Sequence, residues 1–315
     1  MRLEQLKTVA AIVRNGLSVS RAAEALNMPQ PAVSRQLRSF ERELGVDVFV
    51  RKQKRLRGLT RPGEAIVDVA HRMLEDAEKL AKIGRDFYTE ENGTLTVATT
   101  HTQARYALPG IVEAFLRRHP KVRLMLRQGT PAEVNQLVAI GEADICIGSE
   151  PEGEKPGLVL FECYSMKRIL LTPRNHALLK VRQLTLETLA RYPIITYDAP
   201  FIGRSRIVKA FAARGLSPDI VLSSIDSDVI KAYVELGLGI AIVATLAYDA
   251  SRDTRLRAMD ASHLFEPNTI YLGVRRNDYL RGYVYDFIQM FASHLDRKTV
   301  ERGMQAGGHR SRRAS

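Results

Sequence analysis

The segment from residue 31 to 44 carries, on one helical face, side chains that can read the edges of DNA bases. Val33, Leu37, Phe40 and Leu44 recur at helical spacing and predict a buried stripe. The opposite face then presents polar and basic residues: Gln30, Ser34, Arg35 and Arg38. Arginine and glutamine make paired hydrogen bonds to guanine and adenine, and serine reaches bases or phosphates. The simpler alternative is that these arginines form an ordinary solvated helix face.

A second polar run, Thr99–Gln103, follows a strand expected at Leu95–Thr99 and precedes a helix. Its hydroxyl and amide groups, beside free backbone N–H groups, suit an anion and do so without a formal positive charge. Ser149, at the end of another expected strand, and the run Gly203–Ser205, at a helix start, could converge on the same cleft. Ordinary capping of a helix by threonine is the alternative.

Short helices and a strand must position the basic face, and we expect them at residues 3–15, 19–26, 31–44 and 46–50. Ser18 can cap the second helix, Pro31 can start the third, and Gly45 can end it. Two helices joined by a tight turn describe a helix-turn-helix, and the five cations between residues 51 and 57 predict a β-wing along DNA phosphates. We expect these residues to contact double-stranded DNA: Ser18, Ser20, Gln30, Pro31, Ser34, Arg35, Arg38, Arg51, Lys52 and Lys54.

A long helix is expected from Arg61 to Phe87. Its apolar residues lie at heptad-like intervals: Ile66, Val69, Met73, Leu80, Ile83 and Phe87. A strip this narrow is typical of a coiled-coil seam between two chains, which would present two recognition helices to a two-part DNA site. A lone helix that packs on its own domain is the alternative.

The rest of the chain alternates strands with helices, which predicts an α/β fold with parallel sheets. Strands are expected at Leu95–Thr99, Val122–Gln128, Asp144–Gly148, Leu158–Cys163, Ile169–Thr172, Ile194–Tyr197, Asp219–Leu222, Ile240–Val243 and Thr269–Val274. Helices are expected at Leu108–His119, Ala132–Ile140, Arg204–Arg214, Ser227–Leu236 and Arg281–Leu295. In such sheets, ligands collect at the carboxyl ends of the strands.

The net charge of +12 is confined to two stretches of the 315 residues. Residues 1–60 carry 12 Lys and Arg against 5 Asp and Glu, residues 297–315 carry 6 against 1, and the body between them is balanced at 29 against 29. A localised basic block indicates a module that meets a polyanion. We expect the basic tail, 297–315, to be disordered.

Several classes of protein are disfavoured by what the sequence lacks. It has no apolar run long enough for a membrane span, no secretory signal pattern at its N-terminus, and no paired spacing between Cys146 and Cys163. It also lacks a GxSxG elbow, a Walker loop and an HExxH motif. We therefore expect a cytoplasmic protein that is not an enzyme and has neither cofactor nor metal. A solute-binding receptor remains an alternative for the body.

The first 60 residues resemble the winged helix-turn-helix of LysR-type transcriptional regulators. The string Ala98–Pro109 (ATTHTQARYALP) is similar to the signature of one branch of that family, which holds the cysteine-regulon activator CysB and the sulphonate-regulating Cbl. Further matches stand in register at Gln128–Pro131, Gly203–Ser205, Asp226–Lys231 and Tyr285–Gln289. The likeness covers about residues 1–300.

This resemblance implies a winged helix-turn-helix at 1–60, a linker and dimerisation helix at 61–92, and an effector domain at 93–296. The effector domain would consist of two Rossmann-like α/β halves, similar to periplasmic solute receptors, with the effector in the cleft between them. The resemblance further implies a dimer or tetramer that acts with RNA polymerase and has no membrane partner.

By position, the resemblance assigns the effector contacts to Thr100, Thr102, Gln103, Ser149 and position 202. The effector would be an anion of sulphur assimilation: sulphate, adenylyl sulphate, a sulphonate or an acetylserine. Ser149 keeps the hydroxyl of the threonine usual in the branch, whereas Ile202 replaces a threonine and cannot donate. Ile202 favours a ligand with an apolar part. A regulator specific for alkanesulphonate utilisation is therefore the alternative to one for cysteine biosynthesis.

Overall fold

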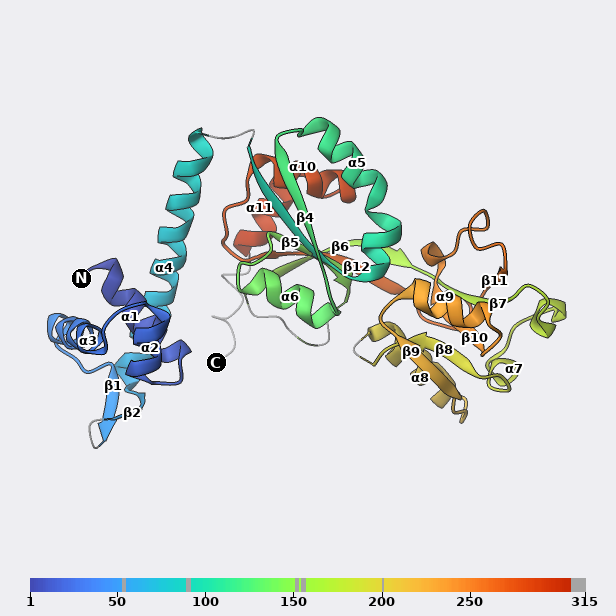
Figure 1. Cartoon of the computed structure of the whole chain (residues 1–315), viewed down its shortest axis with the longest axis horizontal. Coiled ribbons are helices and arrows are strands. Elements are labelled where there is room, and N and C mark those ends of the chain that lie inside the picture. Colours follow the sequence, from blue (N-terminus) through green and yellow to red (C-terminus); the bar gives the residue numbers. More distant parts are fainter. Residues whose placement is uncertain (53–54, 89–91, 151–152, 154–156, 200, 307–315) are drawn as a thin grey trace. The chain divides into compact units, whose positions relative to one another are not determined.

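The computed structural model describes residues 1–52, 55–88, 92–150, 153, 157–199 and 201–306 (Figure 1). The chain divides into two compact units, Met1–Tyr88 and Thr89–Ser315. The first unit contains the helices α1 (Leu3–Arg14), α2 (Val19–Ala25), α3 (Gln30–Leu44) and α4 (Arg61–Tyr88), and a hairpin of β1 (Phe49–Lys52) and β2 (Arg55–Leu59).

The local signals of the first unit are confirmed. The Ser18 hydroxyl accepts from the backbone N–H of Arg21, and Gly45 ends α3 in the left-handed conformation, with φ of 71°. Val33, Leu37 and Phe40 are at most 3% exposed and form the core with α1 and α2. Leu44, expected in the same stripe, is 38% exposed and is the last residue of α3.

Within the described residues, the second unit holds two sheets of five strands, one in each half. The first sheet has the order β4-β3-β5-β12-β6, from β3 (Gly93–Thr99), β4 (Val122–Gln128), β5 (Ile145–Ser149), β6 (Leu158–Met166) and β12 (Asn268–Arg275). The second sheet has the order β11-β7-β10-β8-β9, from β7 (Arg168–Pro173), β8 (Ile194–Tyr197), β9 (Ile220–Ser224), β10 (Ile240–Ala244) and β11 (Leu256–Asp260).

The expectation of parallel sheets is correct only for three strands of each sheet. β3 runs parallel to β4 and β5, and β8 runs parallel to β9 and β10, but β12, β6, β7 and β11 pair antiparallel. These antiparallel strands lie where the chain passes between the halves: β6 and β7 adjoin at Lys167, and β12 returns after β11. The sheets are therefore mixed, and β11 was not expected at all.

Helices cover both faces of each sheet. In the first half, η1 (Gln103–Ala107, a π-helical turn), α5 (Pro109–Arg118), α6 (Pro131–Ala139), α10 (Gly282–Phe291) and α11 (Arg297–Ala306) flank the strands. In the second half the elements are η2 (Ala177–Lys180), α7 (Leu186–Leu189), α8 (Ile202–Ala212), α9 (Ser227–Glu235) and η3 (Thr245–Ala247). α8 packs on one face of the second sheet through Ile207 and Phe211, and α9 packs on the other through Ile230 and Val234.

The expected disorder of the tail is wrong for residues 297–306, which form α11. Val300 and Met304 recur at helical spacing and are at most 3% exposed, within the core of the first half. Residues 307–315 lie outside the described part of the chain. Among the residues described, no helix combines the length and the apolar character needed to cross a membrane.

Candidate functional site

The first unit presents the expected basic face of α3 to solvent. Gln30, Pro31, Arg35 and Arg38 are exposed, and Ser34 is partly buried, where its backbone carbonyl accepts from Arg38 Nε at 3.3 Å. Of the other two serines assigned to DNA, Ser20 is exposed, while Ser18 serves as the cap of α2. Because the apolar side of α3 is packed in the core, the basic side of the same helix faces solvent, where DNA can contact it.

The cations of the wing have two different environments: one forms ion pairs within the protein, and others are exposed to solvent. Arg51 forms ion pairs with Glu41 and Asp47, and Glu41 also accepts the backbone N–H of Val48 at 3.0 Å. The hydrogen bond to Glu41 raises the pKa of Arg51, so this guanidinium fastens the wing to α3. Lys52, Arg55 and Arg57 are exposed. Lys54, also expected at phosphates, lies outside the described residues.

The second unit contains a small cavity of about 30 Å³ where the two halves meet. That is space for one or two groups the size of water, as in a small ion. Four of the five expected effector residues line it: Thr100, Thr102, Gln103 and Ser149. Ile202, the fifth, is partly buried and is not among the lining residues, although Phe201 and Gly203 on either side of it are. We refer to this space as the effector cavity.

Parallel pairing brings the expected residues together. Val97 lies opposite Ile145 and Thr99 opposite Ile147, so the loop after β3 and Ser149 at the end of β5 meet at one edge of the sheet. Thr99 itself donates its hydroxyl to the Ile147 carbonyl at 2.9 Å and does not line the cavity. The chain thus directs Thr100, rather than Thr99, into the cavity.

The amide of Gln103 is oriented by its neighbours. Tyr164 donates its hydroxyl to Oε1, and burial raises the pKa of Tyr164 to about 12, so this hydroxyl keeps its proton. Among the described residues, Nε2 contacts only the thioether of Met166, at 3.9 Å. Gln103 is 1% exposed, and its amino group is therefore a donor with capacity to spare inside the cavity.

The N-terminus of α8 contributes to the other side. Phe201 precedes the helix without a side-chain cap, and Phe201 and Gly203 both line the cavity. The first backbone N–H groups of a helix lack partners within it and attract negative charge. The α8 terminus therefore adds donors from the second half to the hydroxyl and amide groups of the first.

The sequence patterns did not indicate the lining residues on β6, β7, β8 and β12. Met166, Arg168, Tyr197, Asn268 and Ile270 complete the lining together with Phe201 and Gly203. Arg168 is 2% exposed, and burial lowers its pKa. The expectation of a site without formal positive charge is therefore wrong. The available signal was an arginine directly before the buried strand expected at Ile169–Thr172.

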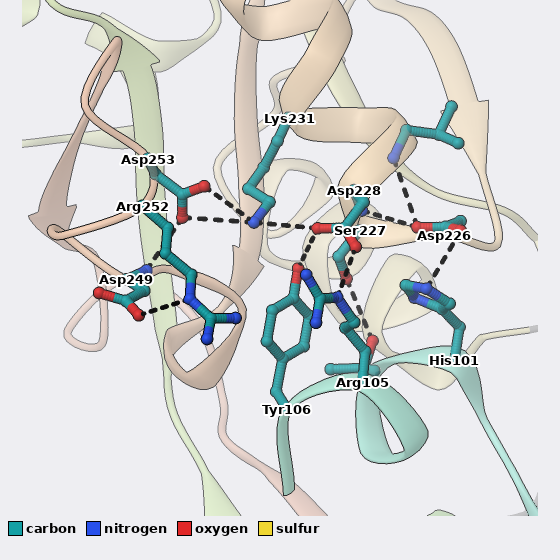
Figure 2. Close-up of polar contacts among 12 residues, drawn as sticks. His101, Arg105, Tyr106, Asp226, Ser227, Asp228, Lys231, Asp249, Arg252 and Asp253 are labelled. Carbon is teal, nitrogen blue, oxygen red and sulfur yellow. Dashed lines mark hydrogen bonds and ion pairs between the residues drawn. The ribbon is translucent and has the colours of Figure 1, made fainter. Parts of the chain in front are cut away.

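Beside the cavity, the N-terminus of α9 joins the two halves (Figure 2). Ser227 Oγ lies 3.1 Å from the hydroxyl of Thr102 in the first half and 2.9 Å from that of Tyr197 in the second. Both Thr102 and Tyr197 line the cavity. A ligand that forms a hydrogen bond with either hydroxyl would therefore change the hydrogen bonds of Ser227.

Charged groups extend this junction. Asp228 accepts from the Tyr106 hydroxyl and from Arg105 Nε at 3.0 Å, and Lys231 Nζ lies 3.0 Å from the same carboxylate. Burial alone would raise the pKa of Asp228, but the hydrogen bonds from these three donors outweigh it and lower that pKa to about 2. Asp228 is therefore ionised at neutral pH and fixes the π-helical turn η1 to α9.

A histidine and two aspartates at this junction lie close to one another, and both carboxylates accept hydrogen bonds or form ion pairs within the chain, whereas Nδ1 of His101 is buried without a partner among the described residues. Ligand atoms of His101, Asp226 and Asp228 fall within 4.8 Å of one another. Asp226 accepts the backbone N–H of Asp228 at 2.7 Å and pairs with His101 Nε2 at 3.1 Å. Asp228 has the three donors named above. The carboxylates of this cluster therefore contribute contacts to the junction.

Comparison with known proteins agrees with both units. The model of the bacterial regulatory helix-turn-helix protein, lysR family, matches residues 3–64, and that of the LysR substrate binding domain matches residues 89–296. The HTH-type transcriptional regulator SsuR of Burkholderia cenocepacia is 48% identical over 300 residues, which cover 95% of this chain and 97% of the relative. CysB of the same organism is 43% identical over 305 residues, with 97% of each chain covered.

Further likeness comes from Escherichia coli and from a solved structure. Cbl of E. coli is 43% identical over 302 residues, which cover 96% of each chain. The crystal structure of the cofactor-binding domain of Cbl superposes with a TM-score of 0.65 at 46% identity, over 68% of this chain and 93% of that one. The expected family is confirmed on both units: the chain belongs to the LysR family of bacterial transcriptional regulators.

Proposed function

We propose that this regulator binds a small anion of sulphur metabolism in the effector cavity and thereby changes its binding to promoter DNA. One observation carries the proposal: three segments that are far apart in sequence converge on one cavity, namely the loop with Thr100, Thr102 and Gln103, the end of β5 at Ser149, and the N-terminus of α8. Among the described residues that line it, none is acidic. A site with many donors and no carboxylate favours an anion.

The candidate effectors are sulphate, adenylyl sulphate, a sulphonate and an acetylserine. A cavity of about 30 Å³ accommodates an anionic head group, and the remainder of a larger effector would lie outside this space. Ile202, partly buried beside two lining residues, supports a ligand with an apolar part, as an alkanesulphonate has. Utilisation of alkanesulphonates is therefore the second candidate function, beside cysteine biosynthesis.

The effector controls DNA binding if it binds one conformation of the regulator more tightly than another. The cavity is lined by residues of both halves, so an occupant stabilises one relative orientation of the halves over others. In an assembly of several chains, that orientation alters the spacing of the recognition helices. Regulation of transcription then proceeds with RNA polymerase at the promoter.

The DNA interface consists of the exposed face of α3 and the wing. Three side chains of the α3 face contact DNA bases: Gln30, Arg35 and Arg38. Four residues lie near the sugar-phosphate backbone of the DNA: Ser18, Ser20, Pro31 and Ser34. Lys52 and Lys54 contact phosphates. Arg51 is assigned to DNA from its place in the wing, although its guanidinium pairs with Glu41 and Asp47.

A thermal-shift screen tests the effector proposal. Sulphate, adenylyl sulphate, alkanesulphonates, O-acetylserine and N-acetylserine are added separately to the full chain, with sodium chloride at equal ionic strength as the control. An effector at 100 times its Kd stabilises the folded state by about 2.7 kcal/mol. For a unit of this size that raises Tm by about 5–10 °C. If none of these anions raises Tm above the chloride control, the proposed function is wrong.

The apolar strip on α4 supports self-association. Val69, Met73, Leu80 and Ile83 are 45%, 38%, 70% and 37% exposed, and they recur at heptad-like spacing. Exposed apolar residues in this pattern are stabilised by a second helix. The side chain of Phe87, expected at the end of this strip, lies outside the described side chains.

Leu80→Glu is expected to reduce the molar mass measured by light scattering after gel filtration, because a buried carboxylate in the seam has no partner. His71→Glu is the matched control, since His71 is exposed and lies on the opposite side of the same helix. An unchanged mass for Leu80→Glu would place the interface elsewhere.

A further inference from the structure

The buried arginine of the effector cavity has no acidic partner within the described part of the chain. Arg168 is 2% exposed, and its nearest ring contact places Cζ 5.7 Å from the centroid of Tyr197. The neighbouring Arg206 is used elsewhere, in an ion pair of 2.9 Å with Glu150. Removing a guanidinium from water without a counter-charge is costly in free energy. The fold must keep such a group for a purpose other than its own stability.

The position of the guanidinium is fixed by a glycine. A Cβ on Gly203 would overlap Nη2 of Arg168, so the missing side chain makes room for the guanidinium against the first turn of α8. The same turn offers backbone N–H groups to the cavity. The guanidinium of Arg168 and the N-terminus of α8 therefore both favour negative charge in the effector cavity, which residues of the first half also line.

We propose that Arg168 supplies the positive charge that balances the effector, so that the cavity selects net anions over neutral molecules of the same shape. This inference rests on the proposed function, and it deepens it by naming the charge class of the ligand. Thr100, Gln103 and Ser149 then contribute shape and hydrogen bonds, which a neutral ligand can also satisfy. The discrimination by charge comes from Arg168, seated on Gly203.

Two kinds of probe separate charge from shape. Isothermal titration calorimetry of the full chain uses sulphate and methanesulphonate as anions and methanesulphonamide as a neutral molecule of similar shape. The native chain should bind the anions and give no measurable heat with the sulphonamide. Equal affinity for methanesulphonate and methanesulphonamide would overturn the inference.

Arg168→Met should weaken sulphate binding about 100-fold, because the charge-assisted hydrogen bonds are lost. The ligand-free variant should melt at the native temperature or above it, because an unpaired charge has left the interior. An arginine with a merely structural role gives the opposite pattern: Tm falls and sulphate affinity is unchanged.

Gly203→Ala keeps the charge but displaces the guanidinium, and it provides a second test should Arg168→Met not fold. We expect about a 10-fold loss of sulphate affinity, since one charge-assisted hydrogen bond is disturbed. Gly110→Ala is the matched control. It also lies second in a helix, α5, and a Cβ there meets no atom within 4 Å. Native affinity in Gly203→Ala would contradict the proposed seat of Arg168.

The outcomes distinguish this inference from the proposed function. If the native chain binds none of the anions, the proposed function itself fails. If the native chain binds sulphate and both Arg168→Met and Gly203→Ala bind it equally well, only the role of Arg168 fails.

Discussion

Sulphate should bind Thr100→Val about 10- to 100-fold more weakly than it binds the native chain, as measured by calorimetry. Thr100 is 5% exposed and lines the effector cavity together with Phe201 and Gly203 at the N-terminus of α8. Valine keeps the shape of threonine and removes only the hydroxyl. A hydrogen bond to a charged group contributes about 1.5–3 kcal/mol, which corresponds to the stated range of affinity.

The adjacent residue provides the control. Thr99 is fully buried, and its hydroxyl donates to the carbonyl of Ile147 instead of facing the cavity. Thr99→Val should therefore lower the free energy of unfolding by about 1 kcal/mol and leave sulphate affinity unchanged. If Thr99→Val weakened sulphate binding as much as Thr100→Val does, the loss would come from general loosening of the loop and the assignment of Thr100 would fail.

Arg35→Ala should lower affinity for a specific DNA site by about 10- to 100-fold while affinity for an unrelated duplex changes much less. Arg35 is exposed on α3, opposite the buried Val33 and Leu37, and it has the reach for the paired bond to guanine. One such base contact is worth about 1–3 kcal/mol of discrimination. Fluorescence anisotropy with a site selected from random sequences measures both affinities.

A wing residue gives the contrasting control. Lys52 is exposed in β1, so Lys52→Ala should weaken binding to both duplexes about equally and reduce the salt dependence by about one ion. If Arg35→Ala instead reduced binding equally on the selected and unrelated duplexes, Arg35 would be a phosphate contact, and α3 would not read the sequence through it.

Much of the first unit could be predicted from local patterns. The caps at Ser18 and Gly45 and the buried positions Val33, Leu37 and Phe40 follow from helix chemistry within a few residues of chain. The ion pair of Arg51 with Glu41 joins residues ten apart, across a turn and into a strand. A count of positive charges in the wing gave no indication of that pairing.

Most strands and helices of the second unit could be predicted from the sequence, but β11, α7, α11 and the strand directions could not. Spacing predicts each strand separately, whereas the direction of β6, β7 and β12 depends on where the chain passes between the halves. The same limit hid the charge of the cavity: Arg168 stands at the start of an apolar strand in sequence, and only the folded chain shows that it lines the cavity together with Thr100. In the tail, α11 was missed because charge was weighed above the spacing of Val300 and Met304.

Occupancy of the effector cavity is expected to change the affinity of the regulator for DNA. The most direct test of this expectation is anisotropy and footprinting of the selected DNA site by the native chain, with and without a saturating amount of the anion that raises Tm most, at constant ionic strength. We predict a change in affinity of about 5- to 150-fold, or a changed footprint, that is absent in Arg168→Met. Identical affinities and footprints for a native chain that demonstrably holds the anion would contradict the account.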